Sequence, residues 1–76
     1  MTLRVHVLAA LPDAPPGLTA AEVRSVVRRA VPGATDAEVI EALGRLGTGR
    51  ADVRQVECAT RRDERGAWVS RWWRVR

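Results

Sequence analysis

The side chains that could act as nucleophiles or proton carriers are few and scattered along the chain. Ser25, Ser70 and Cys58 are potential nucleophiles, and His6 is the only histidine. Nucleophilic catalysis needs a serine or cysteine beside a positioned base and an orienting acid, and the sequence offers no such set. We therefore expect no enzymatic activity. We interpret His6 as a surface or boundary residue and Cys58 as a small buried hydrophobe.

Cofactor and metal sites are also not predicted. One cysteine cannot form an internal disulfide, and no cluster of Cys and His has metal-ligand spacing. Gly47-x-Gly49 is not followed by a helix start and a lysine, as a phosphate-binding loop would be. The chain has no signal-peptide pattern and no run of about 18 apolar residues, so we expect a cytoplasmic protein without membrane contact.

Arginine is the residue type most able to act here, and its chemistry is the binding of anions. All 13 basic residues are Arg, and against nine acidic residues they leave a net charge of +4. Residues 1–43 hold four Arg and five acids, whereas residues 44–76 hold nine Arg and four acids. A basic half beside a near-neutral half favours an anionic partner on one face. The alternative is that the organism's proteome prefers Arg and that these side chains lie on a solvated face.

Two capping boxes locate the elements that must position these arginines. Thr19–Glu22 and Thr35–Glu38 both read Thr-x-x-Glu, and Val31-Pro32-Gly33 lies between them. In such a box the Thr hydroxyl accepts the backbone N–H of the Glu, and the Glu carboxylate accepts the backbone N–H of the Thr. We predict helices over residues 20–30 and 36–46 and, from a stripe that also fits a strand, a helix over residues 2–11.

Apolar spacing predicts which side of each capped helix is buried. In the first, the predicted inward residues are Val23, Val26, Val27, Ala30 and Val31; in the second, they are Val39, Ile40, Leu43 and Leu46. Gly44 should cost about 1 kcal/mol relative to Ala, which indicates close backbone packing or early fraying.

The last third of the chain has the period of strands. We predict strands over residues 53–60 and 67–75, joined by a charged loop at 61–66 whose Gly66 suits a hairpin turn. Alternation places Trp73 and Val75 on one face and Trp68 and Trp72 on the other. We expect Trp73 and Val75 to enter the core and Trp68 and Trp72 to be partly exposed.

The order of these elements resembles the winged helix-turn-helix family. The resemblance covers nearly the whole chain and rests on four pieces, namely 8–11 (Leu-Ala-Ala-Leu), 17–23, 39–46 and 72–75 (Trp-Trp-Arg-Val). It implies a single domain over residues 1–76, of α+β class, with three helices and a C-terminal β-hairpin wing. In that family the third helix commonly enters the DNA major groove and the hairpin tip touches the backbone or minor groove. The resemblance thus directs Thr35, Asp36, Ala37, Glu41 and Arg45 toward DNA.

The third helix departs from what a DNA reader needs. Asp36, Glu38 and Glu41 repel phosphates, and the helix lacks the Asn, Gln or paired Arg that read base edges best. Glu41 either accepts from a cytosine amino group or lies on a solvated face. The wing suits DNA better, since a cluster of Arg at its tip could contact phosphates, unless Asp63 and Glu64 pair with these Arg.

These observations predict duplex DNA binding, sequence-specific or architectural, in transcriptional or phage-type regulation. We expect contacts from the wing, the third helix, the preceding helix and the C-terminal strand: Arg61, Arg62, Arg65, Thr35, Glu41, Arg45, Arg28 and Arg74. Arg24, Arg29, Arg71 and Arg76 would extend the same basic surface. The alternative is a winged-helix module for protein–protein contact or homodimerisation through the Trp68/Trp72 face, without DNA binding.

Overall fold

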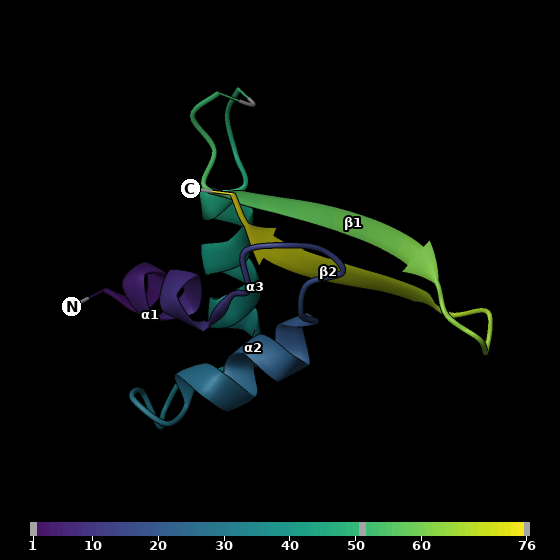
Figure 1. Ribbon diagram of the computed structural model, residues 1–76. Coiled ribbons are helices and arrows are strands. Elements are labelled where there is room, and N and C mark those ends of the chain that lie inside the picture. Colours follow the sequence, from purple (N-terminus) through teal and green to yellow (C-terminus); the bar gives the residue numbers. More distant parts are fainter. Residues whose placement is uncertain (1, 51, 76) are drawn as a thin grey trace.

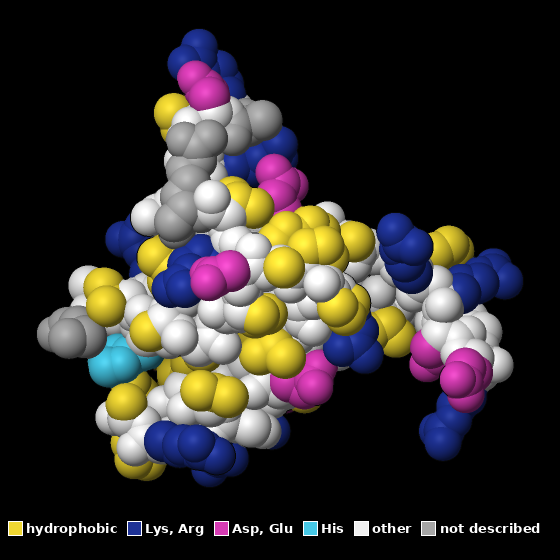
Figure 2. Space-filling model, viewed as in Figure 1, with side chains coloured by type: hydrophobic (Ala, Val, Ile, Leu, Met, Phe, Trp, Pro, Cys, Tyr) yellow, Lys and Arg dark blue, Asp and Glu magenta, His cyan; other side chains and the backbone are white. Residues whose placement is uncertain are grey.

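The chain folds into three helices followed by a two-stranded antiparallel hairpin. In this computed structural model, which describes residues 2–50 and 52–75, the elements are α1 (Leu3–Ala10), α2 (Ala20–Val27), α3 (Asp36–Leu46), β1 (Val56–Arg62) and β2 (Trp68–Arg74). The helices gather together and the hairpin extends away from them as an arm (Figure 1). The space-filling view shows the far end of this arm standing clear of the helices (Figure 2). The α+β class is confirmed, and Arg76 lies outside the described residues.

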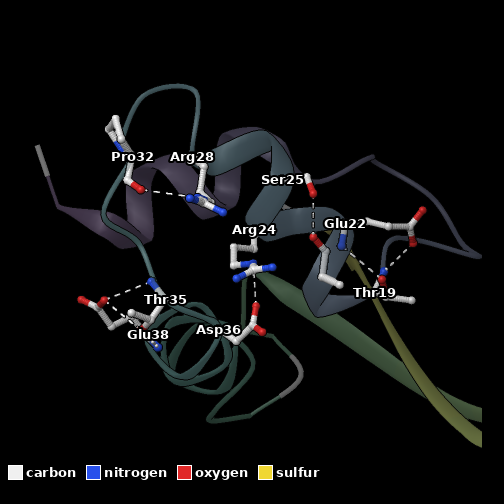
Figure 3. Close-up of polar contacts among 10 residues, drawn as sticks. Thr19, Glu22, Arg24, Ser25, Arg28, Pro32, Thr35, Asp36 and Glu38 are labelled. Carbon is white, nitrogen blue, oxygen red and sulfur yellow. Dashed lines mark hydrogen bonds and ion pairs between the residues drawn. The ribbon is translucent and has the colours of Figure 1, made fainter.

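Both predicted capping boxes are present. The Thr19 hydroxyl accepts from the Glu22 N–H at 3.2 Å, and the Glu22 carboxylate accepts from the Thr19 N–H at 2.9 Å. Thr35 and Glu38 repeat this arrangement at the start of α3 (Figure 3). An ion pair of 2.7 Å between Arg24 and Asp36 then ties α2 to the first residue of α3.

Three predicted boundaries are wrong by a few residues. Helix α2 ends at Val27 because the next turn tightens, with the Ala30 N–H donating to the Val27 carbonyl three residues back. Strand β1 begins at Val56, since Val53 and the residue after it form a turn with Arg50. It continues to Arg62, so the connecting loop is residues 63–67 and not 61–66.

The core gathers apolar side chains from all three helices, from two connecting loops and from the start of β1: Val7, Leu11, Val23, Val27, Ala34, Val39, Ala42, Leu43, Leu46 and Val56. The buried stripe of α3 is rotated relative to the predicted one. Ala42 is buried, whereas Ile40 is 51% exposed. Val26 and Ala30 of the α2 region are likewise exposed.

The hairpin turns the opposite face toward the core from the one predicted. Trp72 packs against the core, while Trp73 lies on the other face and Val75 is 42% exposed. The pairing register explains this outcome. Val56 is buried, and Cys58, two residues along the same face, lies opposite Trp72. Cys58 itself is exposed, so it is not the buried hydrophobe that we expected.

The outer edge of β2 is held by the loop between α1 and α2. Leu18 and Trp72 exchange two backbone hydrogen bonds, both of 2.8 Å. Gly17, just before this bridge, has a φ of +81°, and a Cβ at this position would collide with the Trp72 carbonyl. Only glycine fits there without strain. Within the described residues, none of the helices is long and apolar enough to cross a membrane.

Replacing Gly17 and Gly44 with alanine should change the stability of the protein in opposite directions. Gly17→Ala is expected to lower the free energy of unfolding by about 2 kcal/mol or more, because its φ and the Trp72 backbone both exclude a Cβ. Gly44→Ala is expected to raise it by about 0.5–1 kcal/mol, since a Cβ there has nothing within 4 Å and α3 continues past it. Neither close packing nor fraying therefore accounts for Gly44. Urea unfolding measures both changes, and an unaffected Gly17→Ala variant would contradict the bridge.

Glu22 should make stability depend on acid pH. The Thr19 backbone N–H, assisted by the Thr19 hydroxyl and the Arg71 guanidinium, lowers the pKa of Glu22 from its ordinary value of 4.5. A lowered pKa in the folded state contributes stability at neutral pH, and this contribution is lost as the pH falls below 4.5 and through the folded-state pKa. We expect Glu22→Gln to lose stability at neutral pH and to show a shallower acid dependence in urea unfolding. Glu64→Gln is the control and should retain the wild-type acid dependence.

Candidate nucleic-acid interface

The hairpin tip, residues 61–68, is carried on strands that touch the core only at their base. The seven-residue strands pair from Val56 opposite Arg74 at the base to Arg62 opposite Trp68 at the far end. Between these ends, the hydroxyls of Thr60 and Ser70 lie 2.7 Å apart across the strands. The core ends at Val56, so the tip is displayed beyond the helices (Figure 1).

Asp63 organises the turn at the tip. Its carboxylate accepts the backbone N–H groups of Arg65 at 2.8 Å and Ala67 at 2.9 Å, and its own N–H donates to the Ala67 carbonyl. Gly66, with a φ of +81°, completes the turn by donating its N–H to the Asp63 carbonyl. Within the described residues, neither Asp63 nor Glu64 forms an ion pair with an arginine. The alternative that Asp63 and Glu64 pair with the tip arginines is therefore wrong.

The three tip arginines surround the end of the hairpin. Arg61 and Arg62 lie on β1 and not in the loop, so alternation directs them to opposite faces, and Arg65 lies in the turn. All three are exposed, and no ion pair involves them among the residues that the structure describes. Figure 2 shows dark blue side chains on several sides of the far end, with acidic side chains between them. The positive charge thus lies on more than one side of the tip and does not form one flat patch.

Arg62 is held against an aromatic ring. Its Cζ lies 4.9 Å from the centroid of the Trp68 ring, directly across the strands. Trp68 is 67% exposed. The exposure of Trp68 agrees with the prediction, but sequence reasoning missed this contact, although Arg62 and Trp68 flank the five-residue turn symmetrically. Counting outward from a correctly placed turn would have paired them.

An open groove of about 980 Å³ lies along the other face of the hairpin. Its apolar lining includes Val69 and Trp73 from β2, and the Pro15-Pro16 segment faces them. Arg61 lies at its outer end, and Arg71 is tied to Glu22 by an ion pair of 3.2 Å. A smaller hollow of about 210 Å³ between α3 and the hairpin base includes Gly44 and Cys58 in its lining.

The other five predicted contact residues lie apart from the tip, and each has an intramolecular partner. Thr35 is held by its capping box, and Glu41 pairs with Arg45 along α3 at 3.1 Å. Arg28 donates to the Pro32 carbonyl at 3.4 Å (Figure 3), and Arg74 pairs with Asp13 at 2.5 Å. The structure thus gathers Arg61, Arg62 and Arg65 and distributes the rest over other elements.

His6 is partly buried on α1, in keeping with a boundary residue. Over residues 2–50 and 52–75, no three His, Cys, Asp or Glu side chains gather to hold a metal ion.

No protein-family model, curated protein or solved structure matches this chain. The resemblance to winged helix-turn-helix domains therefore remains a prediction, drawn from the order of the elements and compatible with three helices followed by a hairpin.

Asp63 and Glu64 provide a matched test of the turn. Each change to Ala removes one negative charge, but only Asp63→Ala removes the acceptor of two backbone N–H groups. We expect Asp63→Ala to increase the rate of amide hydrogen exchange at Arg65 and Ala67 by about tenfold, because both N–H groups lose a hydrogen bond to a charged acceptor. Glu64→Ala should leave both rates close to wild type. Equal rates in the two variants would show that the Asp63 carboxylate does not hold the turn.

Proposed function

We propose that this protein binds duplex DNA through the hairpin tip, as a small regulatory or architectural protein of winged helix-turn-helix type. The observation that carries the proposal is the set of three exposed arginines on an extended arm, without carboxylate partners among the described residues. Guanidinium groups form paired hydrogen bonds with phosphate oxygens, and each neutralised phosphate adds a favourable, salt-dependent contribution to binding.

The distribution of charge around the tip suits a groove better than a flat surface. Each groove of duplex DNA is bordered by two phosphate backbones, and a major groove about 12 Å wide admits a two-stranded ribbon. Arg61 and Arg62 lie on opposite faces of β1, so together they could contact the phosphates on both sides of the groove. Because Asp63 is engaged by the turn, the carboxylate that opposes binding most directly is the exposed Glu64.

Helix α3 has a secondary part in this proposal. Its outward acids are already paired, Asp36 with Arg24 and Glu41 with Arg45. The Glu41–Arg45 pair is solvent-exposed and contributes little stability, so Arg45 can exchange Glu41 for a phosphate at small cost. The hairpin supplies most of the affinity, and α3 sets the orientation of the protein on the duplex.

Ile40 favours a second candidate, a protein–protein contact without DNA. It is 51% exposed and shares a face of α3 with Ala37 and Gly44. The Trp68/Trp72 face is a weaker basis for this contact than expected, because Trp72 packs against the core. Sedimentation velocity at micromolar concentration distinguishes the two candidates: a stable dimer that does not bind duplex DNA supports the second.

Removing the tip charges should weaken duplex binding specifically. The variant Arg61→Ala/Arg62→Ala/Arg65→Ala is expected to reduce the slope of log K against log salt by about 3, and to weaken binding at low salt by tenfold or more, about 1.4 kcal/mol. The charge-matched control changes three arginines that lie away from the tip and outside the predicted contact surface, namely Arg4, Arg50 and Arg54, to Ala. Fluorescence anisotropy with a labelled duplex over a salt series measures both.

The control variant should retain most of the wild-type affinity. Equal losses in the two variants would indicate that net charge, and not the hairpin tip, governs binding. An absence of duplex binding by the wild-type protein at low salt would overturn the proposed function.

A further inference from the structure

Trp68 is a large apolar side chain that does not pack into the core. It is the most exposed of the large hydrophobic residues, at 67%, and lies at the end of the hairpin farthest from the core. Trp72, four residues along on the same face, packs against the core. The core therefore reaches the base of this face and stops well short of Trp68.

The surroundings of Trp68 are polar and positively charged. Arg62 lies across from it with its guanidinium over the ring, and the Thr60 and Ser70 hydroxyls form the next pair on the same face. Arg65 follows in the turn. A guanidinium over one face of an indole ring leaves the opposite face open to a second flat group.

We propose that Trp68, steadied by Arg62, is a stacking platform for an unpaired nucleobase. The tip then prefers nucleic acid in which a single-stranded segment adjoins a duplex. This inference rests on the proposed function, because it assigns a second contact to the same tip. The duplex is held by the arginines, and the single-stranded segment places one base on the indole ring.

The choice of an unpaired base follows from what a flat ring can contact. Inside a duplex the faces of the bases are covered by their neighbours, and the grooves present only base edges. A free base face is available in single strands, tails and bulges, where stacking on an aromatic side chain is worth about 1–3 kcal/mol. The phosphates that flank such a base would lie among Arg61, Arg62 and Arg65, so charge complementarity favours this occupant over an uncharged peptide.

The experiment compares three labelled DNA probes with equal numbers of phosphates: a blunt duplex, a duplex with a single-stranded tail, and a single strand. Wild-type protein should bind the tailed duplex about tenfold more tightly than the blunt duplex in fluorescence anisotropy. Trp68→Ala should abolish this preference and leave blunt-duplex affinity within about twofold of wild type. Trp68→Phe retains an aromatic ring and should keep most of the preference.

A spectroscopic readout locates the stacked base independently of affinity. A 2-aminopurine placed in the tail should lose fluorescence on binding wild-type protein, and Trp68→Ala should remove this quenching. Trp68 makes little contact with the core, and amide spectra of the variant should show that the base of the hairpin is intact.

Each remaining outcome overturns the inference. Equal wild-type affinity for blunt and tailed duplexes, or an equal loss for both in Trp68→Ala, would leave duplex binding standing and remove the stacking platform. Tighter Trp68-dependent binding to phosphatidylglycerol vesicles than to the tailed duplex would reassign the tip to a membrane surface. An absence of binding to all three probes would remove the proposed function as well.

Discussion

The backbone bridge between Leu18 and Trp72 is the contact on which the rest of the structure depends. Its two hydrogen bonds join the loop before α2 to the middle of the last strand, and the glycine at position 17 permits the close approach. Trp72 is thereby fixed against the helices. Because a strand alternates its side chains, fixing one residue fixes the face of every other residue on the hairpin. The orientation of the whole arm thus follows from one bridge near its base.

The arginines near the helices and those at the hairpin tip differ in whether they form ion pairs. Three arginines near the helices form ion pairs with acidic residues of the first half of the chain, Arg24 with Asp36, Arg71 with Glu22 and Arg74 with Asp13. Beyond the reach of the helices, the carboxylate nearest the tip arginines accepts backbone N–H groups in place of a guanidinium. Arginines close to the body thus hold the elements together, and those at the tip are free to meet an external anion. Geometry produces this division, since the acidic residues of the first half do not extend along the arm.

The features that the sequence predicts correctly are those that depend on residues close together in the chain. The capping boxes at Thr19 and Thr35 predict the starts of both helices, because a capping box is complete within four residues. Alternation in the last strand predicts which residues share a face, but it does not predict which face is buried. The long-range bridge to Leu18 decides this, so the prediction that Trp73 enters the core and Trp72 does not is wrong. Among the predicted contact residues, the three tip arginines lie together as expected. Thr35, Glu41, Arg45 and Arg28 have partners within four residues in the chain, and only Arg74 has a distant partner, Asp13, which no local pattern indicates.

The exposed apolar residues do not all have the same meaning. A chain of 76 residues has too little interior to cover every apolar side chain, and isolated exposed valines need no functional explanation. Val5, Val26 and Val53 are of this kind, since Val5 and Val26 lie on helices whose opposite sides are buried and Val53 lies in the loop between α3 and β1. Trp68 differs because it lies at the end of the hairpin farthest from the core, with the Arg62 guanidinium over its ring. The cross-strand contact with Arg62 helps to hold the end of the hairpin together, and it leaves the other face of the indole ring open to the base that we propose.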